Sequence, residues 1–473
     1  MLWSRDPAAS VPGMHWPLSL SPLEHGIFVL VGLLTYVVVT RAGGHHRHPS
    51  AAIAWVLLIA LMPYLGLPLF LAFGTRKLVR PPRRFARPPA HSIREGSPWA
   101  LQLLAALDVP PPVRNRSIEL HDDGAVSLNA LLELVEQARE RIDVCTYVIG
   151  DDDVGTAVLA ALARRAQAGV RVRLLIDAIG GLRGARHTVR TLHGSGVEVR
   201  WFMPVVRNPV RGATNLRNHR KLVVVDGESM WSGGRNLAAE YFDDAHDGWV
   251  DLSFVAHGPI ARQAHVLFDR DWHAARGRVV ATGRVDDVDA PALPEGVPAQ
   301  LVPSGPDLAD DTLYALLLAA AFRAERRIVA VTPYFVPEDA LLEAWCVACR
   351  RGVRIDLVVP ERSNHRMADL ARGRALRAFA AAGGQVHLHS SMIHAKAVLV
   401  DDELALCGSA NLDARSLLLN FELMTAFYGR REIDWLAQWA ERQIGRSRSY
   451  VPSPPSWGRD LLEGFVRAVG FQL

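Results

Sequence analysis

Two short stretches of the chain each combine an imidazole, an amine and a carboxylate at the same spacing. Histidine can act as a nucleophile, acid or base, and lysine offers a positive charge to an anion. The repeated spacing therefore predicts two half-sites that handle an anionic group together. The first stretch is NHRKLVVVDG at residues 218–227 and the second is IHAKAVLVDD at 393–402, and the candidate catalytic residues in them are His219, Lys221, Asp226, His394, Lys396 and Asp401.

Both stretches continue into apolar residues and predict strands, in which side chains alternate faces and advance ~3.3 Å per residue. On that geometry His219 and Lys221 share a face, about 7 Å apart. Asp226 stands seven positions beyond His219, which is ~23 Å along a strand and too far to orient that imidazole. The same holds for Asp401 and its own histidine. We expect both aspartates to brace the strand ends or the interface between the two copies.

An asparagine follows each aspartate by ten residues, Asn236 in SGGRN and Asn411 in CGSAN. Small residues before an amide let backbone and side chain approach an anion closely. Two histidines, two lysines and two asparagines placed face to face would form one phosphate site, with one imidazole attacking phosphorus and the other protonating the leaving oxygen. A single H-x-K is usually a strand edge or a solvated patch, but the matched pair favours a functional site.

The elements that carry these residues are also written twice, at residues 127–177 and 311–360. Each copy reads as an amphipathic helix, an apolar strand, a second helix, a GV turn and a second strand, and each continues to its H-x-K stretch. Alternating strands and helices predict an α/β fold of two duplicated α/β/α lobes with largely parallel sheets. The expected ranges are 111–275 for the first lobe, 276–297 for a linker and 298–473 for the second lobe.

Two apolar segments precede the lobes, at residues 25–40 and 51–74. A membrane span needs about 20 apolar residues. We therefore expect an anchoring region over residues 1–75, a hairpin of two transmembrane helices at about 22–40 and 51–73, with prolines kinking the second. A single span is the alternative. A cleaved signal peptide is disfavoured by the weak basic region and the absence of a small-residue cleavage site.

A basic linker, residues 76–110, follows the second apolar segment. Basic residues crowd between Arg76 and Arg87, and no acid appears until Glu95. Such a cluster marks the cytoplasmic side of a membrane and attracts anionic lipid. Arg41 and Arg47, between the two apolar segments, blur this assignment of topology.

The composition is typical of a globular protein, and its mild basicity suits an anionic partner. The 473 residues are 49% hydrophobic and 22% charged, with a net charge of +4 and a pI of about 9.0. This basicity does not choose among nucleic acid, lipid and a phosphorylated metabolite. The four cysteines show no disulfide framework, and Cys346 and Cys349 fit a helix better than a zinc site because no second pair completes one.

The pattern H-x-K-x4-D-x6-G-[GS]-x-N in two copies resembles the phospholipase D superfamily. The apolar N-terminus, SGP at 304–306, TPYFVP at 332–337, GSANLDARS at 408–416 and NFE at 420–422 are similar to the bacterial cardiolipin synthases, and the likeness extends over about residues 25–445. The resemblance implies two α/β lobes that share one central active site. It also implies a two-step displacement through a phosphohistidine, with no metal or other cofactor.

The resemblance further implies roles for individual residues. His219 would be the nucleophile, and His394 would be the general acid and then the base. An acid on a neighbouring strand would orient each histidine, and Asp251 and Glu422 stand at the expected places, with Asp251 the candidate for His219. Both acids lie in apolar runs, where an unpaired carboxylate is costly. The positions that match phosphate-binding residues are Lys221, Lys396, Asn236 and Asn411.

The implied function is that of a cardiolipin synthase, a phosphatidyltransferase of the bacterial inner membrane whose lobes lie in the cytoplasm. Its expected partners are phosphatidylglycerol and anionic membrane lipid, without nucleic acid. A hydrolytic phospholipase D, with water as acceptor, and a membrane-tethered nuclease are the alternatives, whereas a scaffold would not need both motifs. A basic loop holding Arg207, Arg211 and Arg217 either binds the second headgroup or is solvated. The oligomeric state, the acyl preference and the use of phosphatidylethanolamine stay open.

Overall fold

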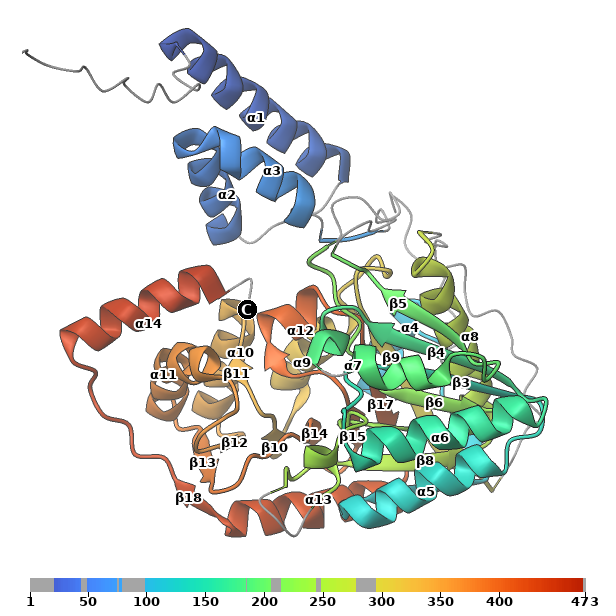
Figure 1. Cartoon of the computed structure of the whole chain (residues 1–473). Coiled ribbons are helices and arrows are strands. Elements are labelled where there is room, and N and C mark those ends of the chain that lie inside the picture. The colour runs from blue at the N-terminus through green and yellow to red at the C-terminus, as the bar shows by residue number, and fades with distance from the viewer. Residues whose placement is uncertain are drawn as a thin grey trace, which may run out of the picture. The chain divides into compact units, whose positions relative to one another are not determined.

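The computed structural model of the protein describes residues 21–43, 49–74, 76–78, 98–183, 185–205, 214–243, 248–277 and 295–470 (Figure 1). It divides into two compact units, an N-terminal unit that ends at Phe70 and a large unit that begins at Leu71. Arg207 and Arg211 lie outside the described residues, as do most of the two predicted linkers.

The N-terminal apolar segments form three helices, α1 (Pro22–Gly43), α2 (Pro49–Leu61) and α3 (Pro63–Phe73). Among the described residues, α1 holds the one helical stretch long and apolar enough to cross a membrane, Pro22–Thr40. The second predicted helix, at 51–73, is not one kinked helix but two, because it ends at Leu61 and restarts at Pro63. Proline lacks an N–H and disfavours a helical residue before it, so it interrupts one helix and begins the next.

The first lobe contains a sheet of seven strands in the order β2-β8-β7-β6-β3-β4-β5. Strands β3, β4 and β5 run parallel, and the other neighbours are antiparallel. Helices α5 and α6 cover one face (Figure 1) and α8 packs on the other. The bounds are β2 Ser117–His121, α5 Gly124–Glu136, β3 Arg141–Thr146, α6 Asp153–Gln167, β4 Arg171–Asp177, α7 Ala185–Thr188, β5 Glu198–Phe202, β6 Leu222–Val225, β7 Ser229–Gly233, β8 Ser253–His257 and α8 Pro259–Ala274, with 3-10 turns at Gly180–Arg183, Val189–Leu192 and Ala239–Tyr241.

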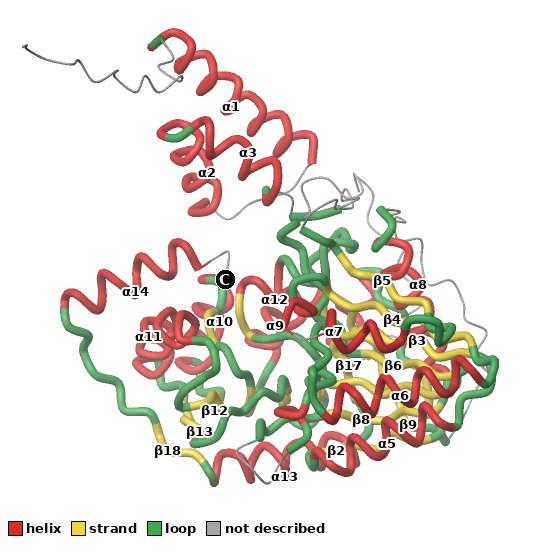
Figure 2. Tube along the Cα trace, in the orientation of Figure 1, coloured by secondary structure: helices red, strands yellow, loops and turns green. Residues whose placement is uncertain are grey.

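The second lobe contains a nine-stranded sheet in the order β1-β9-β17-β15-β14-β10-β12-β13-β18. Its outer face is covered by α9, α10 and α11, and α13 packs on the inner face. Figure 2 shows helices around the strands of both lobes. The bounds are α4 Trp99–Ala106, β1 Val113–Asn115, β9 Val297–Ser304, α9 Thr312–Arg323, β10 Arg327–Val331, β11 Phe335–Val336, α10 Asp339–Arg350, β12 Arg354–Pro360, α11 Arg366–Ala381, β13 Gln385–His389, β14 Ala397–Val400, β15 Leu404–Gly408, β16 Leu412–Asp413, α12 Ala414–Leu418, β17 Glu422–Phe427, α13 Arg430–Gly445, β18 Ser447–Ser449 and α14 Trp457–Gly470.

The duplication is visible in the order of the strands. The order β2-β8-β7-β6-β3-β4-β5 of the first sheet recurs as β9-β17-β15-β14-β10-β12-β13 in the second, so the predicted pair of α/β lobes is confirmed. The expectation of largely parallel sheets is wrong, because only the β3-β4-β5 and β10-β12-β13 parts are parallel. The strand after each H-x-K stretch is joined to the next by a tight turn, which requires antiparallel neighbours.

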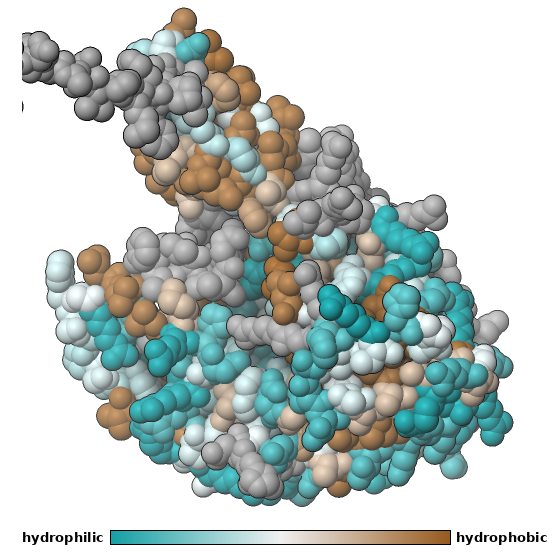
Figure 3. Space-filling view, in the orientation of Figure 1, coloured by the Kyte–Doolittle hydropathy of each residue, from teal (hydrophilic) through white to brown (hydrophobic). Residues whose placement is uncertain are grey.

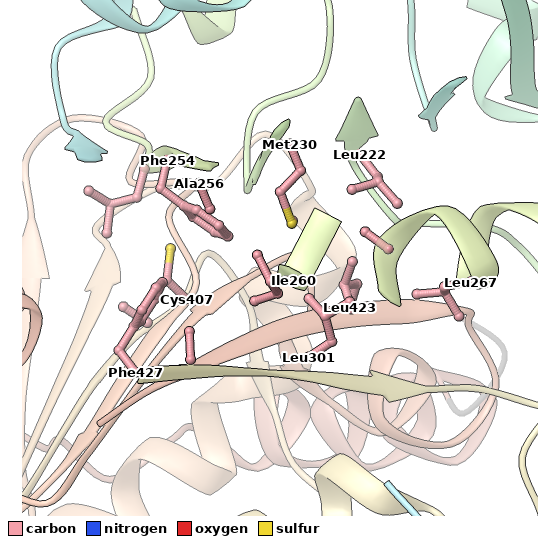
Figure 4. Close-up of a cluster of buried hydrophobic side chains, with 14 of the residues drawn as sticks. Leu222, Met230, Phe254, Ala256, Ile260, Leu267, Leu301, Cys407, Leu423 and Phe427 are labelled. Carbon is pink, nitrogen blue, oxygen red and sulfur yellow. The ribbon is translucent and has the colours of Figure 1, made fainter. Parts of the chain in front are cut away.

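A single hydrophobic core joins the two lobes. It contains residues from the inner faces of both sheets, such as Leu222 and Phe254 from the first and Leu301 and Phe427 from the second, together with α8 and α13. Figure 4 shows side chains of both lobes meeting in this core. Because each sheet buries its inner face against the other lobe, the large unit holds the strand ends of the two lobes in a fixed relation.

Candidate active site

The two H-x-K stretches lie directly ahead of equivalent strands and not within them. Strand β6 begins at Leu222, the residue after Lys221, and β14 begins at Ala397, the residue after Lys396. Strand alternation therefore does not apply to the histidines and lysines themselves. Their positions depend on contacts with the rest of the molecule.

Each histidine is held by backbone hydrogen bonds to the opposite lobe. The His219 N–H donates to the carbonyl of Phe421 at 2.9 Å, and the His394 N–H donates to the carbonyl of Val250 at 2.7 Å. These contacts belong to two isolated parallel bridges between the lobes. The residues that directly follow Phe421 and Val250 are the two predicted orienting acids.

The orienting acids are exchanged between the lobes. Oδ2 of Asp251, in the first lobe, lies 2.6 Å from Nδ1 of His394 in the second. Oε1 of Glu422, in the second lobe, lies 3.4 Å from Nδ1 of His219 in the first. The prediction that Asp251 orients His219 is therefore wrong, because the bridges place each acid beside the histidine of the other lobe.

The imidazole of His394 is tightly enclosed. The Tyr241 and Trp249 rings lie 4.9 and 5.3 Å from it, centroid to centroid. Burial, followed by the charge of Lys396, lowers the pKa of His394 to about 3, although Asp251 opposes this shift. Burial works against ionisation of Asp251, but the attraction and hydrogen bond of His394 hold the carboxyl pKa below its usual value. An ionised carboxylate only accepts, so the imidazole proton sits on Nδ1 and Nε2 keeps its lone pair.

The imidazole of His219 is less constrained. Its side chain is 19% exposed, against 10% for the other histidine, and the Tyr147 ring lies 4.1 Å away, centroid to centroid. Burial lowers the pKa of His219, and Glu422 opposes this. The Glu422 carboxylate accepts the Ser409 hydroxyl at 2.5 Å and the Asn420 amide at 3.2 Å. It is therefore a fixed, buried anion beside the ring.

Both lysine side chains are buried, and each turns back to contact the histidine of its own motif. Nζ of Lys221 donates to the His219 carbonyl at 2.7 Å. Nζ of Lys396 donates to the His394 carbonyl and lies 2.7 Å from Nδ1 and 2.9 Å from Nε2 of the same ring. Burial lowers the pKa of both amines. For Lys396 the pKa falls to about 7, although Asp251 opposes the shift. Buried amines of this kind gain from binding an anion.

Charges of the two half-sites act on each other. The ammonium of Lys221, from the first lobe, lowers the pKa of both His394 and Lys396 in the second. The Glu422 carboxylate of the second lobe raises the pKa of Lys221 in the first, against a larger effect of burial. Coulomb interactions weaken with distance, and each histidine is also paired with an acid of the other lobe. The two motifs therefore form one site.

The two asparagines occupy matching places after β7 and β15. Asn236 and Asn411 are 3% and 6% exposed. In the described part of the chain, Oδ1 of each amide has no hydrogen-bond partner. Rotation of an amide exchanges its oxygen and nitrogen, so the same position can donate to a phosphate oxygen. Equal, partly unsatisfied amides in both lobes fit the predicted phosphate-binding positions.

The two motif aspartates are bound to backbone. Asp226 accepts the N–H groups of residues 139–141, each at 2.8 Å, and Asp401 accepts those of residues 325–327 at 2.8–2.9 Å. Burial opposes ionisation of Asp226, but these bonds hold its pKa below the usual value. Both residues have left-handed backbones, with φ of 53° and 49°. These contacts place the carboxylates at the starts of β3 and β10, where they brace the strands.

Several residues of the site were not singled out from the sequence. Tyr241 and Trp249 enclose a histidine of the other lobe, and Ser409 holds an orienting acid. Asp177, at the end of β4, accepts the backbone N–H of Asn218 at 2.9 Å and so fixes the residue before the nucleophile candidate. Its place at the end of a parallel strand is the one signal that could have indicated it.

Arg217 is not available to bind a headgroup. Its guanidinium donates to Oδ1 of Asp177 at 3.2 Å and to the carbonyls of Met203 and Thr214 at 2.8 and 2.6 Å. The side chain is 2% exposed. Both interpretations of the basic loop, headgroup binding and a solvated surface, are therefore wrong for Arg217, because its side chain is buried and paired.

The cysteine pair belongs to the scaffold. Cys346 and Cys349 are free thiols of α10. Burial raises the pKa of both, that of Cys349 to about 11. Within the described ranges no group of three or more His, Cys, Asp or Glu side chains is placed to hold a metal ion.

Two matched α/β lobes that contribute one H-x-K stretch each define the phospholipase D-like class of proteins. More particularly, the family described as "Cardiolipin synthase, PLD-like domain" matches residues 131–272 and 317–444, one segment in each lobe. A second family, "Phospholipase_D-nuclease N-terminal", matches residues 27–74. The chain belongs to the cardiolipin synthase, PLD-like domain family.

Individual relatives agree with this assignment. Cardiolipin synthase A of Pseudomonas aeruginosa (strain LESB58) is 32% identical over 432 residues, which cover 86% of this chain and 87% of that one. Cardiolipin synthase 2 of Bacillus anthracis is 29% identical over 416 residues, covering 83% and 80%. The crystal structure of phosphatidylserine synthase from Haemophilus influenzae Rd KW20 has a TM-score of 0.62 at 18% identity, covering 79% of this chain and 98% of that one. This last likeness shows a shared fold.

Proposed function

We propose that this protein is a cardiolipin synthase that transfers a phosphatidyl group between two phosphatidylglycerol molecules, giving cardiolipin and glycerol. The observation that carries the proposal is the reciprocal pairing of each imidazole with a carboxylate of the other lobe. This pairing leaves two Nε2 atoms, one per lobe, for one phosphate group, beside two buried lysines. Membership of the cardiolipin synthase family supports the choice of lipid.

In the first step, the Nε2 lone pair of His219 forms a bond to phosphorus. The bond between phosphorus and the glycerol oxygen breaks, and His394 supplies the proton that leaves with glycerol. His394 is neutral in the empty site. A phosphodiester bound by Lys221 and Lys396 adds a negative charge and draws the Lys396 ammonium away from the ring, and both changes favour the protonated imidazole that a general acid requires.

In the second step, the neutral His394 takes the proton from a free hydroxyl of a second phosphatidylglycerol. The resulting oxygen forms its bond to phosphorus while the bond between phosphorus and Nε2 of His219 breaks. One phosphodiester replaces another, so the reaction needs no nucleotide. Asp251 stabilises the positive charge on His394 whenever the ring is protonated, and Glu422 does the same for His219.

We also place the protein at the bacterial inner membrane with its lobes in the cytoplasm. The apolar helix α1 supports membrane attachment, and the basic residues between Arg76 and Arg87 support the cytoplasmic side. Phosphatidylglycerol would then reach the site from the membrane that holds the enzyme.

The test is a product assay on the purified full chain in detergent with phosphatidylglycerol and a metal chelator. Release of glycerol with formation of cardiolipin is the expected result. Phosphatidic acid as the sole lipid product would instead identify a hydrolytic phospholipase D. Cleavage of single-stranded DNA, with phosphatidylglycerol left intact, would identify a nuclease. His219→Ala is the inactive control.

A further inference from the structure

The second apolar segment of the N-terminal unit folds back on itself. The Trp55 ring of α2 lies 5.4 Å from the Phe70 ring of α3, centroid to centroid. A continuous helix would separate residues 55 and 70 by ~22 Å. A Cβ at Gly66 would lie 2.7 Å from the Leu58 carbonyl oxygen, so the missing side chain lets the two arms meet. Helices α2 and α3 form a close helical hairpin.

The hairpin returns to the end of α1 from which it started. Tyr64, at the start of α3, bonds to His25 at 3.0 Å. Phe70, near the end of α3, packs on Tyr36 with ring centroids 5.1 Å apart. Helix α3 therefore runs parallel to α1, and α2 runs antiparallel to it. The tip of the hairpin lies beside the first turns of α1, and the last turns of α3 lie farther along α1, at Tyr36.

The helix lengths agree with one helix that crosses the membrane and a hairpin that enters and leaves it on the same side. Helix α1 has 22 residues, ~33 Å, whereas α2 and α3 have 13 and 11, ~20 and ~16 Å. The hydrocarbon core is about 30 Å thick. Only the first of these three helices is long enough to cross it alone.

At the tip of the hairpin, both backbone groups of Met62 are paired. The Met62 N–H donates to the Leu58 carbonyl at 2.9 Å, and the Met62 carbonyl accepts from the N–H groups of Leu65 and Gly66 at 3.1 and 2.7 Å. Pro63 has no N–H to leave unpaired. Unpaired backbone groups are costly inside lipid, so this pairing lowers the cost of a chain reversal there. The outward side chains are apolar (Figure 3), and the exposed ones include Leu57, Leu61, Met62 and Leu65.

We propose that α1 is the only one of the three helices to cross the membrane and that α2 and α3 form a re-entrant hairpin. The chain before α1 then lies on the opposite side of the membrane from the lobes, whereas two spans would put both on one side. This arrangement also places Arg41 and Arg47 on the same side as the basic residues that follow α3. The charge conflict seen in the sequence disappears, because all these basic residues face the cytoplasm.

The test compares single cysteines at the two chain ends, Ser4→Cys and Leu473→Cys, in the full-length chain with the half-buried Cys349 changed to serine. A membrane-impermeant maleimide is applied to intact cells and to permeabilised cells. We expect position 4 to be labelled in intact cells and position 473 only after permeabilisation. Labelling of both positions from the same side would overturn the proposal.

A second variant tests whether the break in the helix sets this topology. Pro63→Ala, Gly66→Leu and Pro68→Ala together remove the helix breakers and the close contact, which favours one continuous span. Position 4 should then become protected in intact cells, and labelling as in the parent would overturn the assignment to these residues. Leu57→Ala, on the outside of the hairpin, is the matched control and should label as the parent. Turnover in detergent, measured on every variant, reports the lobes separately, so the result does not depend on the proposed reaction.

Discussion

The two halves of the site share a backbone plan and differ in how firmly they hold their histidine. His394 lies 2.6 Å from its acid and is flanked by Tyr241 and Trp249. His219 lies 3.4 Å from its acid beside Tyr147. A firmly held ring keeps one tautomer and one direction, as a proton donor and acceptor needs, whereas a nucleophile must move toward phosphorus. The two lobes carry the same imidazole, and the different neighbours of each ring make the two histidines unequal.

The neighbours of the two acids differ in size in a complementary way. Asp251 fills the space beside Gly234, where a Cβ would lie 2.2 Å from its Oδ1. At the equivalent place in the other lobe, Ser409 donates its hydroxyl to the longer Glu422. A short acid beside a glycine and a long acid beside a serine are two packing solutions to the same task. Each depends on its partner, so the acids are not interchangeable.

The largest expected effect tests whether the histidines have different roles. His219→Ala and His394→Ala should each lower turnover by about 10³-fold or more, because each removes a reacting group. After incubation with phosphatidylglycerol, the intact-protein mass should show an adduct in His394→Ala and none in His219→Ala. An adduct in His219→Ala would reverse the two roles. His273→Ala, an exposed histidine of α8, should leave turnover unchanged.

The exchange of acids between lobes should give the next largest effect. Asp251→Asn and Glu422→Gln should each lower turnover by about 10²-fold, because each leaves an imidazolium without its counter-charge. Double-mutant cycles in the free energy of unfolding, from urea curves, identify the partners. Asp251→Asn should couple to His394→Gln by about 0.5–3 kcal/mol and be additive with His219→Gln within about 0.5 kcal/mol. Coupling to His219 alone would contradict the exchange.

A smaller effect should identify Lys396 through the pH dependence of anion binding. The pKa of Lys396 in the empty site is lowered to about 7, so its positive charge is present below that pH and is lost as the pH rises through it. Affinity for sulfate, whose charge is constant over this range, should fall by up to about tenfold between pH 6 and 8. Titration calorimetry measures this. Lys396→Arg should remove the dependence, because arginine keeps its charge. An unchanged slope in that variant would assign the titration to another group.

The smallest effect on chemistry is expected at the motif aspartates. Asp401→Asn and Asp226→Asn weaken three backbone hydrogen bonds each, which should lower the free energy of unfolding by about 1.5–3 kcal/mol. Asp401 is buried and Asp226 is half-buried, so the loss should be larger for Asp401. Asparagine tolerates the left-handed backbone of both positions. Turnover below the unfolding range should stay within a few-fold of the parent, and a loss comparable to that of a histidine variant would return these residues to the catalytic set.

The features that could be predicted from the sequence are those that depend on short spacing. The duplicated order of helices and strands, the two H-x-K pairs and the two asparagines follow from patterns within a few residues, where chain geometry leaves little freedom. The strand argument also led correctly to Asp226 and Asp401 as braces. The H-x-K stretches precede the strands, but each strand still separates its aspartate from the histidine and lysine of the same motif.

The second apolar segment shows that apolar content alone does not predict how a segment folds. Residues 51–74 are apolar enough for a span, and their hydropathy does not distinguish a straight helix from a hairpin. The reversal depends on Pro63 and on the contact at Gly66, which is a property of two helices packed together. The two prolines were visible, but their consequence needed the packing.

By itself the sequence determined which chemical groups the protein has and that each occurs once per lobe. Only the tertiary structure decided which acid serves which histidine. Asp251 and His394 are 143 positions apart, and their contact follows from the bridge between Val250 and Ile393. Sequence spacing limits the distance between residues that are close together in the chain, because each residue extends the chain by only a few ångströms. Contacts between distant segments are selected by the burial of two sheets against one core, which is a property of the whole fold.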